Sequence, residues 1–338
     1  MVERSKCQGL IWPEPLIVNP TAPHTHSIIL LHGRGSDAEH FGIELLKNRN
    51  SEDRTLGDCF PGAKFIFPTA KKRRSTAIKR IPINQWFDNF SLGDPSERQH
   101  LQYDGIRETS AFVHDLIEKE ASLVGLSHGC AAALHVLLNF KRQESVGEGS
   151  ASFAAFVGMS GWLPFAEILD PRDKKKKDED EEDYSGPVDD DIFGSDGGHD
   201  DHGDDVFGFD GEHDEYDDNS KTEKDCDEAE EHDSLELRQL RAVNTTRDIA
   251  SLPPLSRTDE ALTFARTPPT FLGHGRNDEK VPIKLGSQEK DVLEALGCRV
   301  RWKDYDEGHW YKVPDEIGDI VDFLRTEAGF GAAGAPEA

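Results

Sequence analysis

A serine in the first half of the chain has the surroundings of an activated nucleophile. Ser127 is the third residue of the pentapeptide GLSHG, which follows the apolar run 121–126 and precedes the helix-forming stretch 130–140. A serine on a tight strand-to-helix turn has a strained backbone that small neighbours tolerate, and its hydroxyl is exposed at the sheet edge. The positive helix end also favours an anionic intermediate. We therefore predict that Ser127 is a nucleophile; the alternative is an ordinary glycine-flanked turn.

A serine hydroxyl needs a base to remove its proton, and the base needs an acid to orient it. In folds with such a turn, the partners follow in the order Ser, Asp or Glu, His, each on a loop after a later strand. Asp278 follows the apolar run 269–275, and His309 follows the run 298–305. We predict that His309 takes the proton of Ser127 and that Asp278 holds the imidazole.

Other residues compete for both roles. Glu279 adjoins Asp278, and three further carboxylates precede His309, namely Asp304, Asp306 and Glu307. The rival bases are His32, His128 and His274. His32 and His274 stand before the loops, so we expect them to bind backbone groups instead.

A tetrahedral intermediate also needs hydrogen-bond donors for its oxyanion. In this arrangement the donors are the amide of the residue after the nucleophile and an amide from a loop after an early strand. The first is the amide of His128. The run HGRGSD at residues 32–37 indicates the Arg34 amide as the second, unless this run is only a glycine-rich turn.

The elements that must position these residues alternate between strand and helix. Continuous apolar runs, typical of strands covered on both faces, occur at residues 27–32, 63–67 and 121–126, and residues 153–159, 269–275 and 298–305 also look like strands. Helical spacing of apolar residues occurs at 104–120, 284–296 and 314–327. This order predicts an α/β fold whose mostly parallel sheet is flanked by helices, with reactive groups beyond the carboxyl ends of the strands.

Charge divides the chain into parts. The net charge is -27, and residues 171–240 hold 29 acidic against 8 basic residues. So acidic a segment has too few apolar residues to offset its chain entropy, and we expect it to be disordered. We therefore predict a first part of the catalytic domain at 1–170, an acidic disordered insertion at 171–247, a second part at 248–330, and a flexible tail at 331–338.

Composition also limits cofactors, partners and location. No stretch has the length of a secretory signal or membrane span, and the five cysteines lack metal-site spacing, so we expect a cytoplasmic protein without a metal. The run 174–177, KKKK, could support nuclear entry. The insertion is too negative to bind nucleic acid and has no calcium-loop pattern, although it contains four histidines. Nothing in the sequence indicates an oligomeric state.

Seven sequence blocks, in order, resemble the phospholipase/carboxylesterase family that includes the acyl-protein thioesterases. They read HSIILLHGRGSD, FPTA, QWFDNFSL, GLSHGCAAALHVLL, FVGMSGWLP, FLGHGRNDEKVP and YDEGHWYKVPDEIGDIVDFL. The resemblance implies an α/β-hydrolase fold and cofactor-free hydrolysis of acyl esters or thioesters, including palmitoyl groups on S-acylated proteins. It places the catalytic triad on Ser127, Asp278 and His309.

The chain departs from this family at three positions near the serine. His128 replaces the usual Gln, Cys130 a Gly, and Arg34 an apolar residue. These differences leave the small-ester carboxylesterases and the lysophospholipases as alternatives to a palmitoyl-protein thioesterase. An alternative of another class is a catalytically silent scaffold whose acidic insertion binds a basic partner.

Two sequence features bear on the substrate. Four large apolar residues could line an acyl groove above the serine or belong to the core. They are Trp86, Phe87, Trp162 and Leu163. The basic run 71–74, KKRR, could support transient contact with a membrane surface, or it could be a solvated loop.

Overall fold

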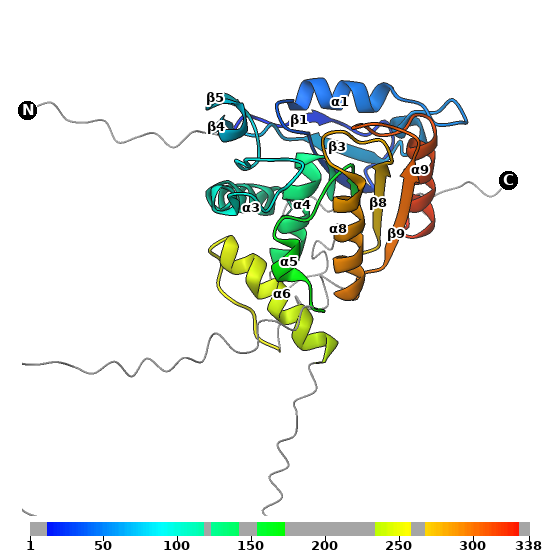
Figure 1. The fold of residues 1–338 in the computed structure, drawn as a ribbon. Helices are drawn as coiled ribbons and strands as arrows, with labels where there is room; N and C mark the ends of the chain where they lie inside the picture. The colour runs from blue at the N-terminus through cyan, green and yellow to red at the C-terminus, as the bar shows by residue number, and fades with distance from the viewer. Residues whose placement is uncertain (1–11, 118–122, 142–153, 173–233, 258–267, 331–338) are drawn as a thin grey trace, which may run out of the picture. The chain divides into compact units, whose positions relative to one another are not determined.

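A seven-stranded sheet forms the centre of the protein in the computed structural model, with the strand order β1-β3-β2-β6-β7-β8-β9 (Figure 1). The structure describes residues 12–117, 123–141, 154–172, 234–257 and 268–330. The strands are β1 (Leu16–Val18), β2 (His26–Leu31), β3 (Ala63–Phe67), β6 (Leu123–Leu126), β7 (Phe156–Met159), β8 (Thr270–Gly275) and β9 (Val300–Tyr305). All of them belong to one compact unit, composed of Met1–Lys174 and Asp233–Ala338.

All neighbouring strands of this sheet are parallel except the edge strand β1, which is antiparallel to β3. The parallel strands end at one edge, as the strand-helix alternation predicted. A separate antiparallel hairpin consists of β4 (Lys72–Ser75) and β5 (Ile81–Asn84), joined through the 3-10 turn η1 (Thr76–Ile78).

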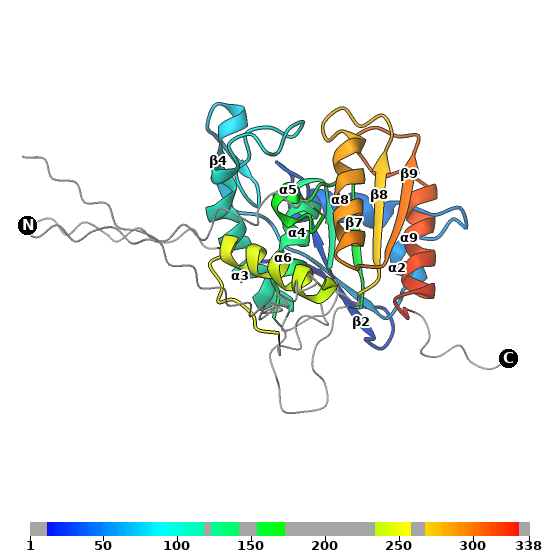
Figure 2. The same ribbon diagram turned by 60° about the horizontal axis from the view of Figure 1, so that its bottom comes forward.

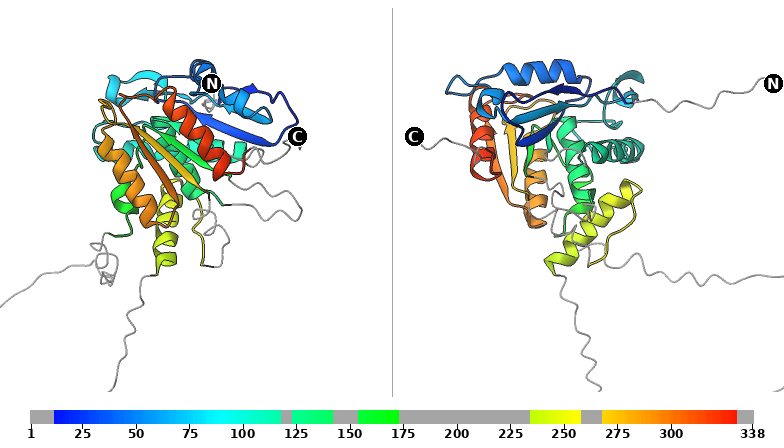
Figure 3. Two further views of the ribbon diagram at one scale, coloured as in Figure 1. Left: turned by 90° about the vertical axis from the view of Figure 1, so that its right-hand side faces the viewer. Right: turned by 180° about the vertical axis from the view of Figure 1, so that it is seen from behind.

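Helices cover both faces of the sheet (Figures 2 and 3). One face is covered by α1 (Ala38–Lys47), α2 (Leu56–Cys59) and α9 (Asp315–Thr326). The other is covered by α3 (Tyr103–Ile117), which follows the 3-10 turn η2 (Gln99–Gln102), and by α4 (His128–Asn139), α5 (Ala166–Leu169), α6 (Leu235–Ile249) and α8 (Ile283–Ala295). Successive strand residues therefore enter different cores: Phe271 packs under α9 and Leu272 under α8. This explains the unbroken apolar runs.

The six predicted strands and the four predicted helices, including α4 after the serine, are confirmed, with ends shifted by a few residues. The sequence did not predict the edge strand β1, the β4–β5 hairpin, the two 3-10 turns or the helices α1, α2, α5 and α6. None of the helices in the described part of the chain combines the length and the apolarity that crossing a bilayer requires.

The predicted end of the acidic insertion, residue 247, is wrong. Helix α6 begins after Ser234, whose hydroxyl accepts the Leu237 amide, and it packs against α4 and α5. Ala242 is buried there, and the Arg247 side chain donates to the Asn139 carbonyl at 2.6 Å. The strong net negative charge of the whole stretch concealed the helix at its C-terminal end. The rest of the predicted insertion, residues 173–233, and the predicted tail 331–338 lie outside the described residues.

Candidate active site

Ser127 occupies a strained turn between β6 and α4. Its φ of 54° and ψ of -118° are unusual for a residue with a side chain, and such a conformation costs on the order of 1–3 kcal/mol. Two glycines make the turn possible: a Cβ on Gly129 would lie 2.2 Å from the Leu31 carbonyl oxygen, and one on Gly125 would lie 2.6 Å from the Cys130 Cα. The Ser127 amide donates to the Met159 carbonyl at 2.8 Å, which fixes the turn against β7.

Three predicted side chains meet at this turn. The Ser127 Oγ lies 2.9 Å from His309 Nε2, and His309 Nδ1 lies 2.8 Å from Oδ2 and 3.0 Å from Oδ1 of Asp278. With the proton on Nδ1, the imidazole donates to the carboxylate and accepts the serine hydroxyl. The geometry therefore gives a continuous path from a nucleophile through a base to an acid.

The Asp278 carboxylate is held ionised by its surroundings. Its Oδ1 accepts the amides of Lys280 and Val281, each at 2.9 Å. Burial raises the pKa of Asp278, but hydrogen bonds from His309 and these two amides outweigh burial, so the pKa lies below its usual value. A carboxylate fixed in this way can keep a neighbouring imidazole in one orientation.

The rival carboxylates have other surroundings. Glu279 is exposed, and Asp304 forms an ion pair with Arg276. Asp306 accepts the side-chain amide of Asn277 at 2.8 Å, and Glu307 accepts the amide of Gly308 at 3.0 Å. Of these acids, only Asp278 contacts the imidazole of His309 in the described structure.

The rival histidines contact backbone groups or are enclosed by rings. His32 donates to the Gly33 carbonyl at 2.7 Å and accepts the Ala70 amide at 3.0 Å, and burial lowers its pKa to about 4. His274 donates to the Val281 carbonyl at 2.9 Å, and burial lowers its pKa as well. The prediction that these two histidines bind backbone is confirmed.

The two predicted oxyanion donors lie on either side of the serine. His128 is the first residue of α4. A Cβ on Gly33 would lie 3.7 Å from the Ser127 Cβ, so the loop that carries Arg34 passes directly beside the nucleophile. Gly35, with φ +82°, donates to the Asn84 carbonyl at 2.7 Å and anchors this loop to β5. The position agrees with an oxyanion site, and the role of both amides stays a prediction.

The four aromatic and apolar residues considered for an acyl groove are packed in the core. Trp86 and Phe87 are 0% exposed, Trp162 1% and Leu163 4%. The Trp86 indole donates to the His32 carbonyl at 2.8 Å, and the Phe87 ring lies 4.1 Å from the ring of His128. The groove interpretation of these residues is therefore wrong for this structure. Sequence could not separate the alternatives because aromatic residues serve both uses.

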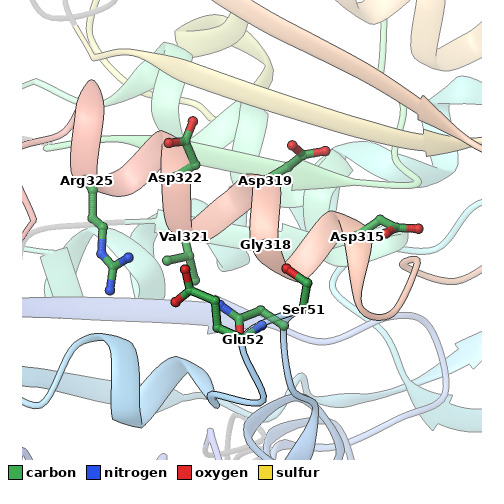
Figure 4. Close-up of a pocket in the computed structure, with 9 residues that line it drawn as sticks. Ser51, Glu52, Asp315, Gly318, Asp319, Val321, Asp322 and Arg325 are labelled. Carbon is green, nitrogen blue, oxygen red and sulfur yellow. The ribbon is translucent and has the colours of Figure 1, made fainter.

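Two cavities lie away from the three catalytic candidates. One, of about 420 Å³, opens between α9 and the segment after α1 (Figure 4). Its lining is largely acidic and consists of Asn50, Ser51, Glu52, Asp315, Gly318, Asp319, Val321, Asp322 and Arg325. The other, of about 410 Å³, lies beside the loop at 32–37 and is lined by Pro13, Asp37, Thr69, Ala70, Lys71, Lys72 and Asn84. Neither lining includes Ser127, Asp278 or His309.

Sequence reasoning missed several residues that support the site. The Ser160 hydroxyl donates to the Trp310 carbonyl at 3.2 Å, next to His309. Glu316 accepts the Lys312 amide at 2.9 Å and so closes the same loop onto α9. Asn89 accepts Arg34 Nη1 at 3.0 Å. Each is an ordinary polar residue in sequence, and only its burial in the fold distinguishes it.

No group of three or more His, Cys, Asp or Glu side chains in the described ranges is arranged to hold a metal ion.

Comparisons with known proteins agree with the fold. Residues 13–176 match the family described as Phospholipase/Carboxylesterase. The chain is 28% identical over 160 residues to acyl-protein thioesterase 1 of Schizosaccharomyces pombe, covering 45% of this chain and 62% of that protein. It is 30% identical over 129 residues to mouse lysophospholipase-like protein 1, covering 36% and 51% of the two chains. The matched region thus spans less than two thirds of these curated relatives.

The solved structure of Zea mays acyl-protein thioesterase 2 has the same fold. The TM-score is 0.55 at 23% identity, with 94% of this chain and 99% of that chain covered. The architecture around Ser127 is that of an α/β-hydrolase.

Proposed function

We propose that this chain, whose residues 13–176 match the phospholipase/carboxylesterase family, is a serine hydrolase that cleaves carboxylic esters or thioesters through an acyl-enzyme. The observation that carries the proposal is the hydrogen-bonded path from Ser127 Oγ through His309 to Asp278. Nucleophile, base and orienting acid recur in this arrangement on unrelated folds because acyl transfer needs all three roles.

In the acylation step, Ser127 Oγ attacks the carbonyl carbon while His309 Nε2 accepts the hydroxyl proton. The carbonyl oxygen becomes an oxyanion, which the amides of Arg34 and His128 would stabilise. The bond to the leaving oxygen or sulfur then breaks, and His309 returns the proton to the leaving group. The ionised Asp278 stabilises the imidazolium throughout and remains unprotonated.

In the second step, a water molecule attacks the acyl-serine ester. His309 accepts a proton from the water, the second tetrahedral intermediate collapses, and the proton returns to Ser127 Oγ. The products are the carboxylic acid and the free serine, so the cycle consumes one water and needs no cofactor.

For the substrate, we propose an acyl-protein thioesterase-like activity on S-acylated proteins, as the names of the relatives suggest. The β4–β5 hairpin supports transient contact with a membrane surface. It exposes Ile78 (40%) and Ile81 (52%) beside the exposed cations Lys72 and Arg74. A cytoplasmic location, with nuclear entry through the lysine run at 174–177, belongs to the same proposal.

A small-ester carboxylesterase is the second candidate, and one observation favours it. The aromatic residues that could have lined a long acyl groove are buried in the core. Activity on a palmitoylated peptide should be compared with activity on short and long p-nitrophenyl esters. A preference for short chains by more than about tenfold, or 1.4 kcal/mol, would favour the carboxylesterase. Strong hydrolysis of a lysophospholipid would instead favour a lysophospholipase.

Labelling by a fluorophosphonate probe tests the proposal directly, because the probe reacts with an activated serine. We expect the wild-type protein to be labelled and to hydrolyse p-nitrophenyl esters, and Ser127→Ala to lose both properties. Ser91→Ala, a change at a serine far from the triad in sequence, is the control and should retain both. An unlabelled, folded wild-type protein would contradict the hydrolase and favour the scaffold.

A further inference from the structure

Arg34 places a half-buried cation beside the nucleophile. Its loop lies against Ser127, and its Nη1 donates to the side-chain oxygen of Asn89, which is 1% exposed. Within the described ranges, no carboxylate lies within ion-pair distance of Arg34. Burial lowers the pKa of Arg34, and the charge of Asp88 opposes this shift; the Asp88 carboxylate itself accepts both the amide and the hydroxyl of Thr76. A half-buried guanidinium with only a neutral partner is costly unless an anion binds it.

Two buried side chains lie near the loop of this cation. Neither ring nitrogen of His128 makes a close hydrogen bond, although the Phe87 backbone lies near this ring, and Nε1 of Trp162 also lacks a partner; the two side chains are 0% and 1% exposed. The two rings lie 5.8 Å apart, and Phe87 packs against both. Because both rings are closed to solvent, the charged group available to a ligand here is Arg34.

His128 adds no second positive charge beside Arg34. Burial lowers the pKa of His128 well below its usual value, and the positive charge of Arg34 lowers the pKa further. The imidazole is therefore neutral at physiological pH. The guanidinium of Arg34 offers one positive charge and several donors, which suits a carboxylate.

We propose that Arg34 binds a carboxylate that the substrate carries close to its scissile carbonyl. This inference rests on the proposed hydrolase function and names its substrate class. Because Arg34 carries both the predicted oxyanion amide and the guanidinium, the carboxylate and the reacting carbonyl belong within a few bonds of each other. Half-esters of short dicarboxylic acids fit if the anion is on the acyl group. Thioesters of short mercapto acids fit if it is on the leaving group.

Matched substrate pairs test which of these the site prefers. On the acyl side, 4-methylumbelliferyl hemisuccinate differs from the butyrate by a carboxylate in place of a methyl group. On the leaving-group side, the acetyl thioester of 3-mercaptopropionate differs from that of propanethiol in the same way. The quantity to compare is the ratio of kcat/KM for the anionic and the neutral member of each pair.

We expect Arg34→Gln to lower this ratio by about tenfold or more in one of the pairs, the size of a lost charged hydrogen bond. Glutamine can still donate to Asn89 but carries no charge. Arg74→Gln removes an exposed cation from the β4–β5 hairpin and is the matched control, with both ratios unchanged. Equal ratios in wild type and Arg34→Gln for both pairs would overturn the inference.

A binding measurement separates this inference from the proposed function. Calorimetry of monomethyl succinate and of 3-mercaptopropionate with Ser127→Ala needs no turnover, and adding Arg34→Gln should weaken binding of one of them by about tenfold or more. Arg34-dependent binding without hydrolysis of any ester would refute the hydrolase and keep the anion site. Hydrolysis of neutral esters without any dependence on Arg34 in either assay would refute the anion site and keep the hydrolase.

Discussion

Replacing Asp278 by asparagine should almost abolish turnover while keeping the fold. The carboxylate uses its two oxygens differently: Oδ1 accepts the amides of Lys280 and Val281, and Oδ2 lies 2.8 Å from His309 Nδ1. In Asp278→Asn, the side-chain carbonyl oxygen must take the place of Oδ1 and accept the two backbone amides, because an NH2 group in that place would face two donors. The NH2 group then faces His309 Nδ1.

The size of the effect follows from this orientation. An NH2 group donates, so Nδ1 must accept, and the imidazole proton moves to Nε2. His309 then faces Ser127 Oγ, 2.9 Å away, with an N–H that cannot take the hydroxyl proton. A serine hydrolase with this wrong tautomer loses about four orders of magnitude in kcat, roughly 5.5 kcal/mol. We expect Asp278→Asn to lose kcat on this scale with a much smaller change in KM.

Steady-state hydrolysis of a p-nitrophenyl ester measures the loss, and circular dichroism checks that the fold remains. Glu279→Gln is the matched control, because it removes the neighbouring, exposed carboxylate that sequence could not distinguish from Asp278. Its kcat should stay near that of the wild type. If Asp278→Asn kept more than about a tenth of the activity, or Glu279→Gln lost as much as Asp278→Asn, the assignment of the acid would be refuted.

Two further changes test the structure around the nucleophile. Burial raises the pKa of Glu289 from 4.5 to about 8, so the folded protein keeps a proton that the unfolded chain releases, and stability falls as pH rises through this interval. Glu289→Gln should therefore raise the melting temperature more at pH 9 than at pH 6, whereas Glu294→Gln, a change to a half-exposed side chain on the same helix, should show no such difference. Gly129→Ala places a Cβ 2.2 Å from the Leu31 carbonyl oxygen and should cost about 1–3 kcal/mol or more in chemical denaturation and abolish fluorophosphonate labelling. Gly308→Ala meets nothing within 4 Å and should stay stable; equal losses in the two variants would contradict the close packing at the turn.

Much of the fold was predictable because the central strands are covered on both faces. Runs such as 63–67 and 270–275 are mostly apolar and do not alternate with polar residues, and this pattern needs no knowledge of the partner strand. The β4–β5 hairpin was not predictable in this way, since its residues are largely charged or exposed and Pro82 lies in its second strand. Its strands pair with each other at the edge of the domain, and no apolar face marks them.

The triad was predictable because its residues follow a known chain order. The residues that bind the acyl group were not predictable in this way. Ser127, Asp278 and His309 each follow a strand, and the carboxyl ends of parallel strands meet at one edge. Whether Trp86 is buried or lines a groove depends instead on tertiary contacts. One of them is the hydrogen bond from the Trp86 indole to the His32 carbonyl, and no local sequence pattern predicts it.

The register of the sheet explains how a triad can be assembled across a long insertion. Strands β7 and β8 pair directly in parallel, although the acidic segment separates them in sequence. Beyond the ends of β8 and β9, the amide of Arg276 donates to the Tyr305 carbonyl at 2.8 Å and that of Asn277 to the Glu307 carbonyl at 3.0 Å. These backbone bonds bring the Asp278 and His309 loops together without using either side chain. Because loop-closure entropy rises only slowly with length, lengthening the connection between β7 and β8 costs little. The strands that carry the base and the acid can therefore stay in register with the serine.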